Sequence, residues 1–500
     1  MIPRARNANP LPAFDLGDVL GRPRPAPAEP RRAARAPRPP REPVPARRGR
    51  PGPFAGRTPI APHAPIHRGS TAQVQGLYPF LYGAGMPNVG VYIGLDCLTG
   101  GAFSCHPIEW LLRGLITNPN LLITGEPGAG KSGTIKALML RLAAYGVRSF
   151  VVGDIKNEYA KLARALGVEP VELGPGLRNR LNPLDAGPLG KNLPSGGEEL
   201  HERLAEIHRR RLTLLVSLLV MRLGRAVTPT EEAALSLAIH HASGQATART
   251  TLADPTIPEI WAHLRDPRPE MAEDLRIPGG SITELREMIR PVCDALGNMV
   301  QGSLSGIFDG PTTVEMDFDA PIQTVDLSRI HGRADETVAM TLACVSSWGQ
   351  AAIDDPTGPS RLVVRDELWR AIRVPAMVKK LDSDLRLSRA HGTIQVLATH
   401  RLSDFEAVGV AGSEEVAIAK NLISSCDVRI CLAQDTGPLE MTREAIALTD
   451  TEAAHIAGWG AAEIGRALWK IGRASSHIVQ CSLTPLERQL FYTNERMSLI

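Results

Sequence analysis

The chain has 500 residues, of which 43% are apolar and 22% are charged, and its formal net charge at pH 7 is +3. That length and apolar content permit a large buried core divided among two or three domains of about 100–200 residues each. The seven cysteines are Cys97, Cys105, Cys293, Cys344, Cys426, Cys431 and Cys481. They show no Cys-x-x-Cys spacing, which argues against a disulfide scaffold or a zinc cluster and favours buried thiols in a reducing compartment.

The sequence also argues against a membrane-spanning protein. Its longest apolar run, residues 212–221, is flanked by arginines and is too short, because a spanning helix needs ~20 apolar residues. No signal peptide opens the chain. We therefore expect a cytoplasmic protein with at most a peripheral contact at the inner face of the cell membrane.

The positive charge is concentrated at the N-terminus. Residues 1–68 contain 14 arginines, no lysine, four acidic residues and 17 prolines, so the rest of the chain is slightly acidic. With almost no apolar periodicity, residues 1–65 cannot bury enough surface to offset their ordering entropy, and we predict a disordered Arg/Pro-rich tail. Its arginine clusters suit DNA or an anionic membrane surface through counterion release. A solvated tail without a specific partner is the alternative.

The central motif of the chain lies at residues 121–132, after a globular lead-in whose residues 90–96 predict a short strand of a hairpin. The motif reads Leu-Leu-Ile-Thr-Gly-Glu-Pro-Gly-Ala-Gly-Lys-Ser, an apolar strand that enters a glycine-rich turn and precedes a helical stretch at 133–144. This is P-loop spacing, in which glycines leave backbone N–H groups free to surround phosphate oxygens. Lys131 then reaches the terminal phosphates as a catalytic cation, and the Ser132 hydroxyl holds Mg²⁺. The expected nucleotide contacts are Gly125, Glu126, Pro127, Gly128, Ala129, Gly130, Lys131, Ser132 and Gly133. An accidental glycine-rich turn is the alternative.

A second buried strand is predicted at residues 149–154, and its exit carries Asp154, Lys156 and Glu158 at alternate positions. Strand exits in parallel α/β sheets are where ligands bind, so this trio is a candidate for nucleotide contacts. The alternative is an ordinary polar end of a strand.

Residues 197–305 show apolar spacing typical of helices, interrupted by Pro229 and by a loop at 254–258. We expect an inserted helical subdomain. Its basic run, Arg209, Arg210 and Arg211, is interpreted as a solvated helix face, with a substrate-facing role as the alternative. Strand spacing returns at 321–327 and helix spacing at 337–352.

Residues 361–367 form an apolar strand that ends in two adjacent carboxylates, Asp366 and Glu367. This Walker B pattern predicts that Asp366 orders the Mg²⁺ shell and that Glu367 polarises the attacking water as the catalytic base. Surface charge is the alternative for an isolated pair of this kind.

A helix carrying Arg386 and Arg389 follows, then a strand at 393–399 that ends at His400. Arginines three residues apart lie on one helix face. A cation that one subunit supplies to the γ-phosphate bound by its neighbour stabilises the charge of the transition state. Solvated helix arginines are the equally weighted alternative. His400 lies where a γ-phosphate sensor is expected, or is a satisfied strand-end histidine. One more strand is predicted at 427–434 and a terminal hairpin at 466–483.

Several of these motifs occur together in one order. They are Gly-Glu-Pro-Gly-Ala-Gly-Lys-Ser (125–132), Asp-Ile-Lys-Asn-Glu-Tyr (154–159), Leu-Asn-Pro-Leu-Asp (181–185), Gly-Ile-Phe-Asp-Gly (306–310), Val-Arg-Asp-Glu-Leu-Trp (364–369), Arg-Leu-Ser-Arg-Ala-His-Gly (386–392), Ala-Thr-His (398–400) and Leu-Thr-Pro-Leu-Glu-Arg-Gln-Leu (483–490). The ordered set resembles the conjugation and type IV secretion ATPases of the VirB-four and TraC kind, within the HerA/FtsK superfamily of ring motors. The resemblance covers roughly residues 67–495.

The resemblance implies nucleotide contacts at 125–132, Mg²⁺ chemistry at Asp366, a catalytic base at Glu367 and an arginine finger at Arg386 or Arg389. It also implies a homo-oligomer, expected to be a hexamer, that works with type IV secretion or conjugation channel components. Two features depart from the family. His400 stands where the family usually has Gln, and the Arg/Pro tail stands in place of the large N-terminal domain that docks the ATPase on the channel.

We therefore expect an α/β protein with a RecA-like P-loop NTPase core and a mainly parallel sheet. The expected organisation is a tail (1–65), an N-terminal core part (66–196), the inserted all-α subdomain (197–305) and a C-terminal core part (306–500). The expected function is ATP hydrolysis with Mg²⁺ by a ring motor that drives conjugative transfer or type IV secretion of DNA or protein. The alternatives are an FtsK/HerA-like DNA translocase or coupling protein, and a nucleotide-binding scaffold that does not hydrolyse ATP. The adjacent carboxylates Asp366 and Glu367 argue against the scaffold, which has no need of a catalytic base.

Overall fold

A computed structural model describes residues 86–492 except 192, 195, 245–252, 315, 331, 354–357, 373–374, 407, 409–412 and 473–474. The predicted tail, with its suggested contacts to DNA or to an anionic membrane, lies outside the described residues. Within the described residues no helix is both long enough and apolar enough to cross a membrane.

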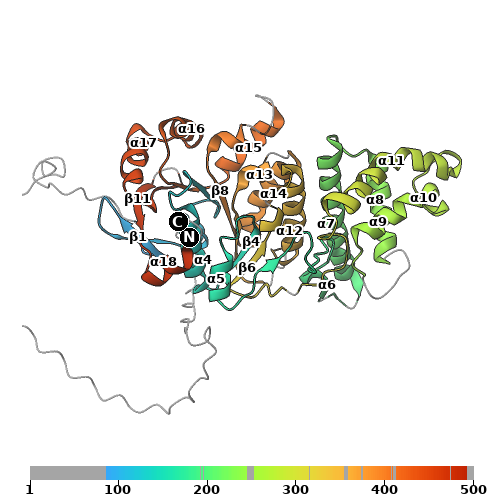
Figure 1. The fold of residues 1–500 in the computed structure, drawn as a ribbon, viewed down its shortest axis with the longest axis horizontal. Coiled ribbons are helices and arrows are strands. Elements are labelled where there is room, and N and C mark those ends of the chain that lie inside the picture. Colours follow the sequence, from blue (N-terminus) through green and yellow to red (C-terminus); the bar gives the residue numbers. More distant parts are fainter. Residues whose placement is uncertain are drawn as a thin grey trace, which may run out of the picture. The chain divides into compact units, whose positions relative to one another are not determined.

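The described residues are organised around one large sheet (Figure 1). Its strands are β1 (Val91–Asp96), β2 (Ala102–Cys105), β3 (Leu121–Thr124), β4 (Arg148–Asp154), β5 (Val171–Glu172), β6 (Ile322–Asp326), β7 (Arg361–Arg365), β8 (Thr393–Thr399), β9 (Val428–Cys431), β10 (Arg466–Ile471) and β11 (Ser475–Cys481). Their order across the sheet is β2-β1-β11-β10-β9-β3-β8-β7-β4-β6-β5. Strands from β9 to β5 pair in parallel, whereas β10, β11, β1 and β2 extend the sheet in antiparallel pairs.

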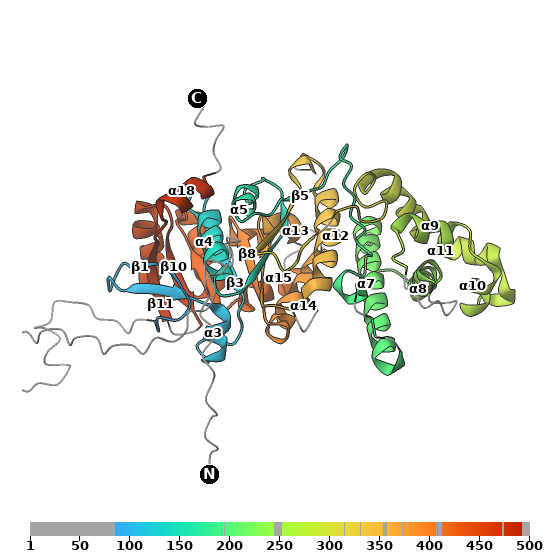
Figure 2. The same ribbon diagram turned by 90° about the horizontal axis from the view of Figure 1, so that it is seen from below.

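Helices cover both faces of this sheet, as the near-continuous apolar character of the central strands requires. They are α3 (Pro107–Leu112), α4 (Lys131–Ala143), α5 (Ala160–Ala165), α12 (Asp335–Ile353), α13 (Leu368–Ile372), α14 (Pro375–His391), α15 (Glu414–Ser424), α16 (Thr436–Ile446), α17 (Asp450–His455) and α18 (Pro485–Phe491). The short helix α6 (Pro188–Lys191) packs on α12 instead. One apolar core lies beneath α3, α4, α5 and α18, and another beneath α12 to α16. Figure 2 shows several of these helices from below, among them α4, α12 and α14. The predicted α/β class and mainly parallel sheet are confirmed.

The N-terminal hairpin of β1 and β2 does not pair with the P-loop strand. It pairs through β1 with β11, so β11, β10 and β9 separate it from β3. The predicted strand at 90–96 is therefore present, but it extends the antiparallel end of the sheet.

The segment with helical spacing forms α7 (Gly197–Leu223), α8 (Pro229–Ser243), α9 (Ile257–Arg265), α10 (Pro269–Asp274) and α11 (Ile282–Asn298). Local signals explain the helix starts, since α8 and α9 begin with capping boxes at Thr228–Glu231 and Thr256–Glu259 and carry Pro in the first turn. The apolar side of α7 packs against α12 and α14 and continues the core beneath them. The helical segment is thus joined to the sheet through α7.

The interpretation of Arg209, Arg210 and Arg211 as a solvated face is wrong for two of the three. Arg209 is exposed and pairs with Glu206, but Arg210 and Arg211 are only 8% and 1% exposed. Successive helix positions differ by 100°, so three neighbouring arginines cannot share one face. The spacing of α7 therefore turns two of them towards the core.

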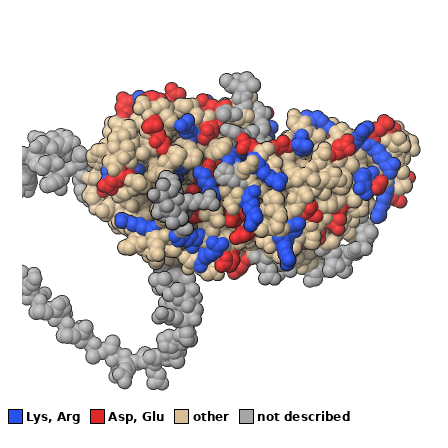
Figure 3. All heavy atoms as spheres, viewed as in Figure 1, with Lys and Arg blue, Asp and Glu red and all other residues tan. Residues whose placement is uncertain are grey.

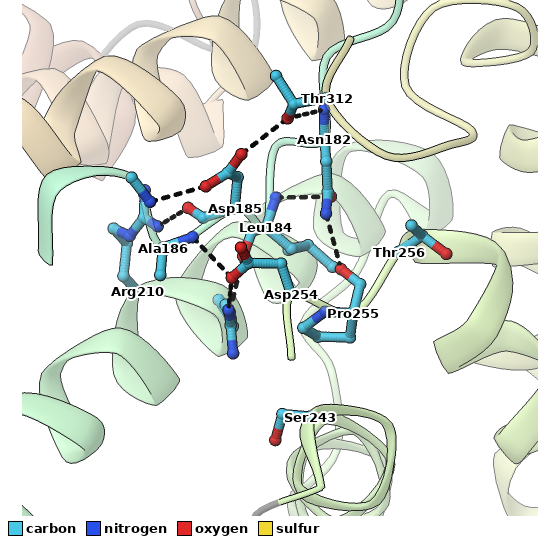
Figure 4. Close-up of polar contacts among 12 residues, drawn as sticks. Asn182, Leu184, Asp185, Ala186, Arg210, Ser243, Asp254, Pro255, Thr256 and Thr312 are labelled. Carbon is cyan, nitrogen blue, oxygen red and sulfur yellow. Dashed lines mark hydrogen bonds and ion pairs between the residues drawn. The ribbon is translucent and has the colours of Figure 1, made fainter. Parts of the chain in front are cut away.

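These two arginines bind the α7 helix to the loop after β5 and to α12. Figure 4 shows Arg210 beside Asp185 of that loop. Arg210 donates to the carbonyls of Ser347, at 2.8 Å, and Asp185. Arg211 donates from Nε to the carbonyl of Leu184 at 2.7 Å and pairs with Asp254 at 2.5 Å. Guanidinium groups suit this place because one planar cation satisfies several buried acceptors at once.

We expect Arg211→Ala to lower the free energy of unfolding by about 1.5–3 kcal/mol, because the buried carbonyl of Leu184 loses its charged donor. Arg209→Ala, two positions away on the exposed face, should change it by only about 0.5 kcal/mol or less. Urea unfolding of both variants measures the difference. Equal midpoints for Arg211→Ala and the wild type would show that the junction contributes little to stability.

Candidate nucleotide site

The candidate site lies at the carboxyl edge of the parallel part of the sheet. The strands β3, β8, β7 and β4 are neighbours in that order, and they pair in parallel. Their carboxyl ends carry the P-loop, His400, the Asp366–Glu367 pair and the loop from Asp154 to Glu158. Parallel topology thus brings together motifs that lie far apart in the sequence.

The P-loop backbone needs its glycines. Gly130 caps the N-terminus of α4 with φ 108°, and a Cβ there would lie 2.8 Å from the backbone nitrogen of Gly465. That close approach coincides with a hydrogen bond from the Gly465 amide to the Ala129 carbonyl, at 2.9 Å. A second hydrogen bond, from the Glu126 amide to the Ala433 carbonyl at 3.0 Å, also holds the loop. Pro127 and Gly128 remain exposed at its tip.

Lys131 is buried at the first position of α4. Its ammonium donates to the carbonyls of Gly125, at 2.6 Å, and Glu126, at 3.0 Å, and to His400 Nδ1 at 2.8 Å. Burial lowers the pKa of Lys131 to about 8, against the opposing effect of the Asp366 and Glu367 carboxylates. Ser132 and Gly133 follow on the same turn and are half-buried.

His400 connects the P-loop lysine to the Walker B glutamate. Its Nδ1 lies 2.8 Å from Lys131 Nζ and its Nε2 lies 3.3 Å from Glu367 Oε1. Because an ammonium only donates, Nδ1 is the acceptor and Nε2 carries the proton that faces Glu367. The geometry therefore assigns the tautomer of the ring.

Asp366 is held by two donors at the end of β7. The Tyr159 hydroxyl donates to Oδ2 at 2.8 Å, and the Glu367 amide donates to Oδ1 at 2.9 Å. Burial raises the pKa of Asp366; the Tyr159 hydrogen bond opposes this rise and the negative charge of Glu158 adds to it. A nearby cation would offset the cost of this buried charge.

Glu367 has a backbone φ of 52°, a conformation that side-chain-bearing residues seldom adopt. Its Oε1 accepts from Lys156 and His400, and its Oε2 accepts from Trp369 Nε1 at 2.6 Å. Burial alone would raise the pKa of Glu367, but the hydrogen bonds from His400, Lys156 and Trp369 outweigh it and hold the pKa well below its usual range.

The three candidates after β4 point to different partners. Asp154 is buried and accepts the backbone amides of Glu158, at 2.8 Å, and Tyr159, at 2.7 Å. Burial raises the pKa of Asp154 to about 6, which those two hydrogen bonds oppose. Lys156 forms an ion pair with Glu367, and Glu158 is half-buried. The Asp154 side chain thus shapes the loop, whereas Lys156 reaches the Walker B carboxylate.

Arg386 and Arg389 do not join this cluster. Both are exposed on α14, and Arg386 pairs with Asp382 at 2.9 Å. The neighbouring Leu385 carbonyl accepts from Asn120 at 3.0 Å, and Asn120 immediately precedes β3. Since the P-loop follows the other end of β3, these arginines lie near the amino edge of the sheet, across from the site of their own chain.

Sequence reasoning missed two residues that hold the Walker B carboxylates, Tyr159 and Trp369. Tyr159 is the last residue of the motif at 154–159, and Trp369 is the last residue of the motif at 364–369. Their place in these motifs was the sequence signal that could have identified them. A buried aromatic side chain with one polar atom suits this task, because it packs in the core while its hydroxyl or N–H donates to a carboxylate.

The residues present fit a magnesium-bound nucleotide. Within the described ranges no cluster of three or more His, Cys, Asp or Glu side chains is arranged to hold a metal ion on its own. Mg²⁺ does not require such a cluster, because it usually keeps several waters and binds through one or two protein oxygens together with substrate phosphates. Ser132 and Asp366 supply such oxygens, and the exposed P-loop tip opens a helix N-terminus, where anions bind favourably.

Solved structures of other proteins have a similar fold. No family model matches the sequence, and no curated protein matches it. Among solved structures, VirB4 of Thermoanaerobacter pseudethanolicus is similar, with a TM-score of 0.61 and 22% identity, over 81% of this chain and 100% of that one. The conjugative coupling protein TrwB is similar with a TM-score of 0.51 and 14% identity, over 84% of this chain and 95% of that one. TrwB has been solved with the ATP analogue ADPNP and with ADP and Mg²⁺. This chain therefore has the fold of the P-loop proteins VirB4 and TrwB.

Proposed function

We propose that this chain is an ATPase that acts as a ring motor in conjugative transfer or type IV secretion. The observation that carries the proposal is the placement of Lys131, Asp366 and Glu367 at one sheet edge, bridged by His400. This set matches the needs of phosphoryl transfer, which are a phosphate-binding lysine, a magnesium ligand and a water-orienting base. The likeness to VirB4 favours the secretion setting.

In this mechanism the P-loop amides and Lys131 bind the β- and γ-phosphates. Ser132 and Asp366 would hold Mg²⁺, which would neutralise charge on the phosphates. Tyr159 keeps the Asp366 carboxylate oriented. Glu367 accepts a proton from the attacking water, and His400 lies between Glu367 and Lys131, where it senses the γ-phosphate. Asp154 and Glu158 support the loop that carries Lys156.

The working assembly is proposed to be a homo-oligomer, most simply a hexamer, at the cytoplasmic face of the cell membrane with channel components.

A second candidate function is DNA pumping as a coupling protein, which the likeness to TrwB favours. Basic and acidic side chains are interspersed on the face of the described residues shown in Figure 3, so neither sign dominates there. The arginine content of segment 1–68 makes this segment the proposed DNA contact.

The proposal is tested by ATP turnover of the purified chain. We expect magnesium-dependent hydrolysis that chelation with EDTA abolishes, and we expect Lys131→Ala to weaken nucleotide binding, because that side chain is the cation of the P-loop. Radiolabelled ATP and fluorescent-nucleotide titration give the two readouts. Tight ATP binding without any turnover would favour the alternative of a non-hydrolysing scaffold.

A further inference from the structure

The Glu367 carboxylate is enclosed by donors. Its side chain is 11% exposed, Oε1 accepts from Lys156 and His400, and Oε2 accepts from Trp369. A general base takes a proton through a lone pair that faces the attacking water within hydrogen-bond reach. Oε1 is the oxygen that His400 links to Lys131 of the P-loop, and two donors already occupy it, whereas Oε2 accepts from one. Oε1 must therefore lose one of its two donors before it can serve as the base on the side of the P-loop.

Lys156 differs from the other two donors. It is the charged one, its side chain is 41% exposed, and it comes from the loop after β4, the strand that pairs with β7. Trp369 belongs to the same turn as Glu367, and His400 is anchored to Lys131 on its other side. Asp154 fixes the far end of the Lys156 loop through the Glu158 and Tyr159 amides. The half-exposed Lys156 side chain is therefore the donor that can leave without displacing backbone.

We propose that Lys156 is a positioning residue that restrains Glu367: its ammonium holds the carboxylate away from the attacking water, and turnover requires this ion pair to open. The inference rests on the proposed ATPase function. It adds this restraining role to the sequence-based expectation that Lys156 contacts nucleotide.

A bound triphosphate supplies the group that opens the pair. His400 contacts Lys131 Nζ at 2.8 Å and Glu367 Oε1 at 3.3 Å, and Lys156 pairs with the same Oε1, so the Lys156 ammonium lies beside the carboxylate that His400 links to the P-loop lysine. Phosphate oxygens bound by Lys131 are anions that compete with Glu367 for the Lys156 ammonium. The restraint thus links release of the base to occupation of the P-loop.

The test compares kcat and KM for ATP in Lys156→Met and the wild type. Removing the ammonium should raise kcat roughly three- to tenfold, the range for loss of one charge-assisted hydrogen bond to a partly exposed lysine. Lys156→Arg keeps the charge and should stay near the wild-type rate. Lys420→Met is the matched control, because Lys420 is also exposed and also pairs with a glutamate, Glu406 at 2.8 Å, on another part of the chain.

The double variant Lys156→Met, Glu367→Gln shows whether the gain acts through the base, since it should be as slow as Glu367→Gln alone. Thermal melting checks folding, and Lys156→Gln provides a second neutral variant if the Met variant melts early. A kcat that is unchanged or lower in folded neutral variants would overturn the restraint while leaving the ATPase intact. A wild-type chain without magnesium-dependent turnover would overturn the proposed function and this inference together.

Discussion

Glu367→Gln should bind ATP and Mg²⁺ like the wild type and hydrolyse ATP about 10²–10⁴-fold more slowly, the usual contribution of general-base catalysis. The substitution is nearly isosteric, and its amide oxygen still accepts one of the hydrogen bonds that the carboxylate receives from Lys156, His400 and Trp369. The Asp366 carboxylate keeps its Tyr159 donor. Binding and folding should therefore persist while proton transfer is lost.

Titration with a fluorescent ATP derivative and a steady-state phosphate assay separate these two effects. Glu414→Gln is the matched control, because Glu414 is 71% exposed and pairs with Lys379 on the surface. We expect that control to turn over ATP like the wild type. If Glu367→Gln also kept the wild-type rate, another group would have to accept the proton, and Glu367 would not be the base.

The site was predictable from sequence where a motif coincided with the end of a strand. Lys131, Asp366, Glu367 and His400 each follow an apolar stretch, and parallel pairing brings such ends to one edge whatever the strand order. The order of the strands across the sheet could not be predicted from local sequence patterns. The position of the β1–β2 hairpin beside β11 depends on long-range pairing, and so does the adjacency of β4 and β7 that brings Lys156 to Glu367.

Side-chain partners were harder to predict than strand ends. The run Arg209–Arg211 has the composition of a solvated face, yet tertiary packing turns Arg210 and Arg211 onto buried carbonyls. Asp154 occurs at a position typical of ligand contacts, yet its oxygens accept two amides of its own loop. Local pattern therefore indicates which residues are polar at an element's end, whereas packing decides what they bind.

Turnover should also require an arginine from a neighbouring subunit. An additional arginine commonly stabilises transition-state charge in this chemistry and is worth about 10³–10⁵ in rate. Arg386 and Arg389 lie near the amino edge of the sheet, where Leu385 contacts Asn120, so they cannot reach the P-loop of their own chain. Their exposure on α14 suits a contact with the site of the next protomer.

The double variant Arg386→Ala, Arg389→Ala should therefore be nearly inactive, and so should Lys131→Ala, each when assayed alone. Mixing the two should restore part of the activity, because a protomer with intact Lys131 and Glu367 can then face a neighbour with intact arginines. Mixing Lys131→Ala with Glu367→Gln is the matched control: both defects lie in the same half of the site, so every interface stays incomplete. Wild-type turnover by the double arginine variant, or specific activity that stays constant on dilution far below the assembly range, would rule out a finger supplied in trans.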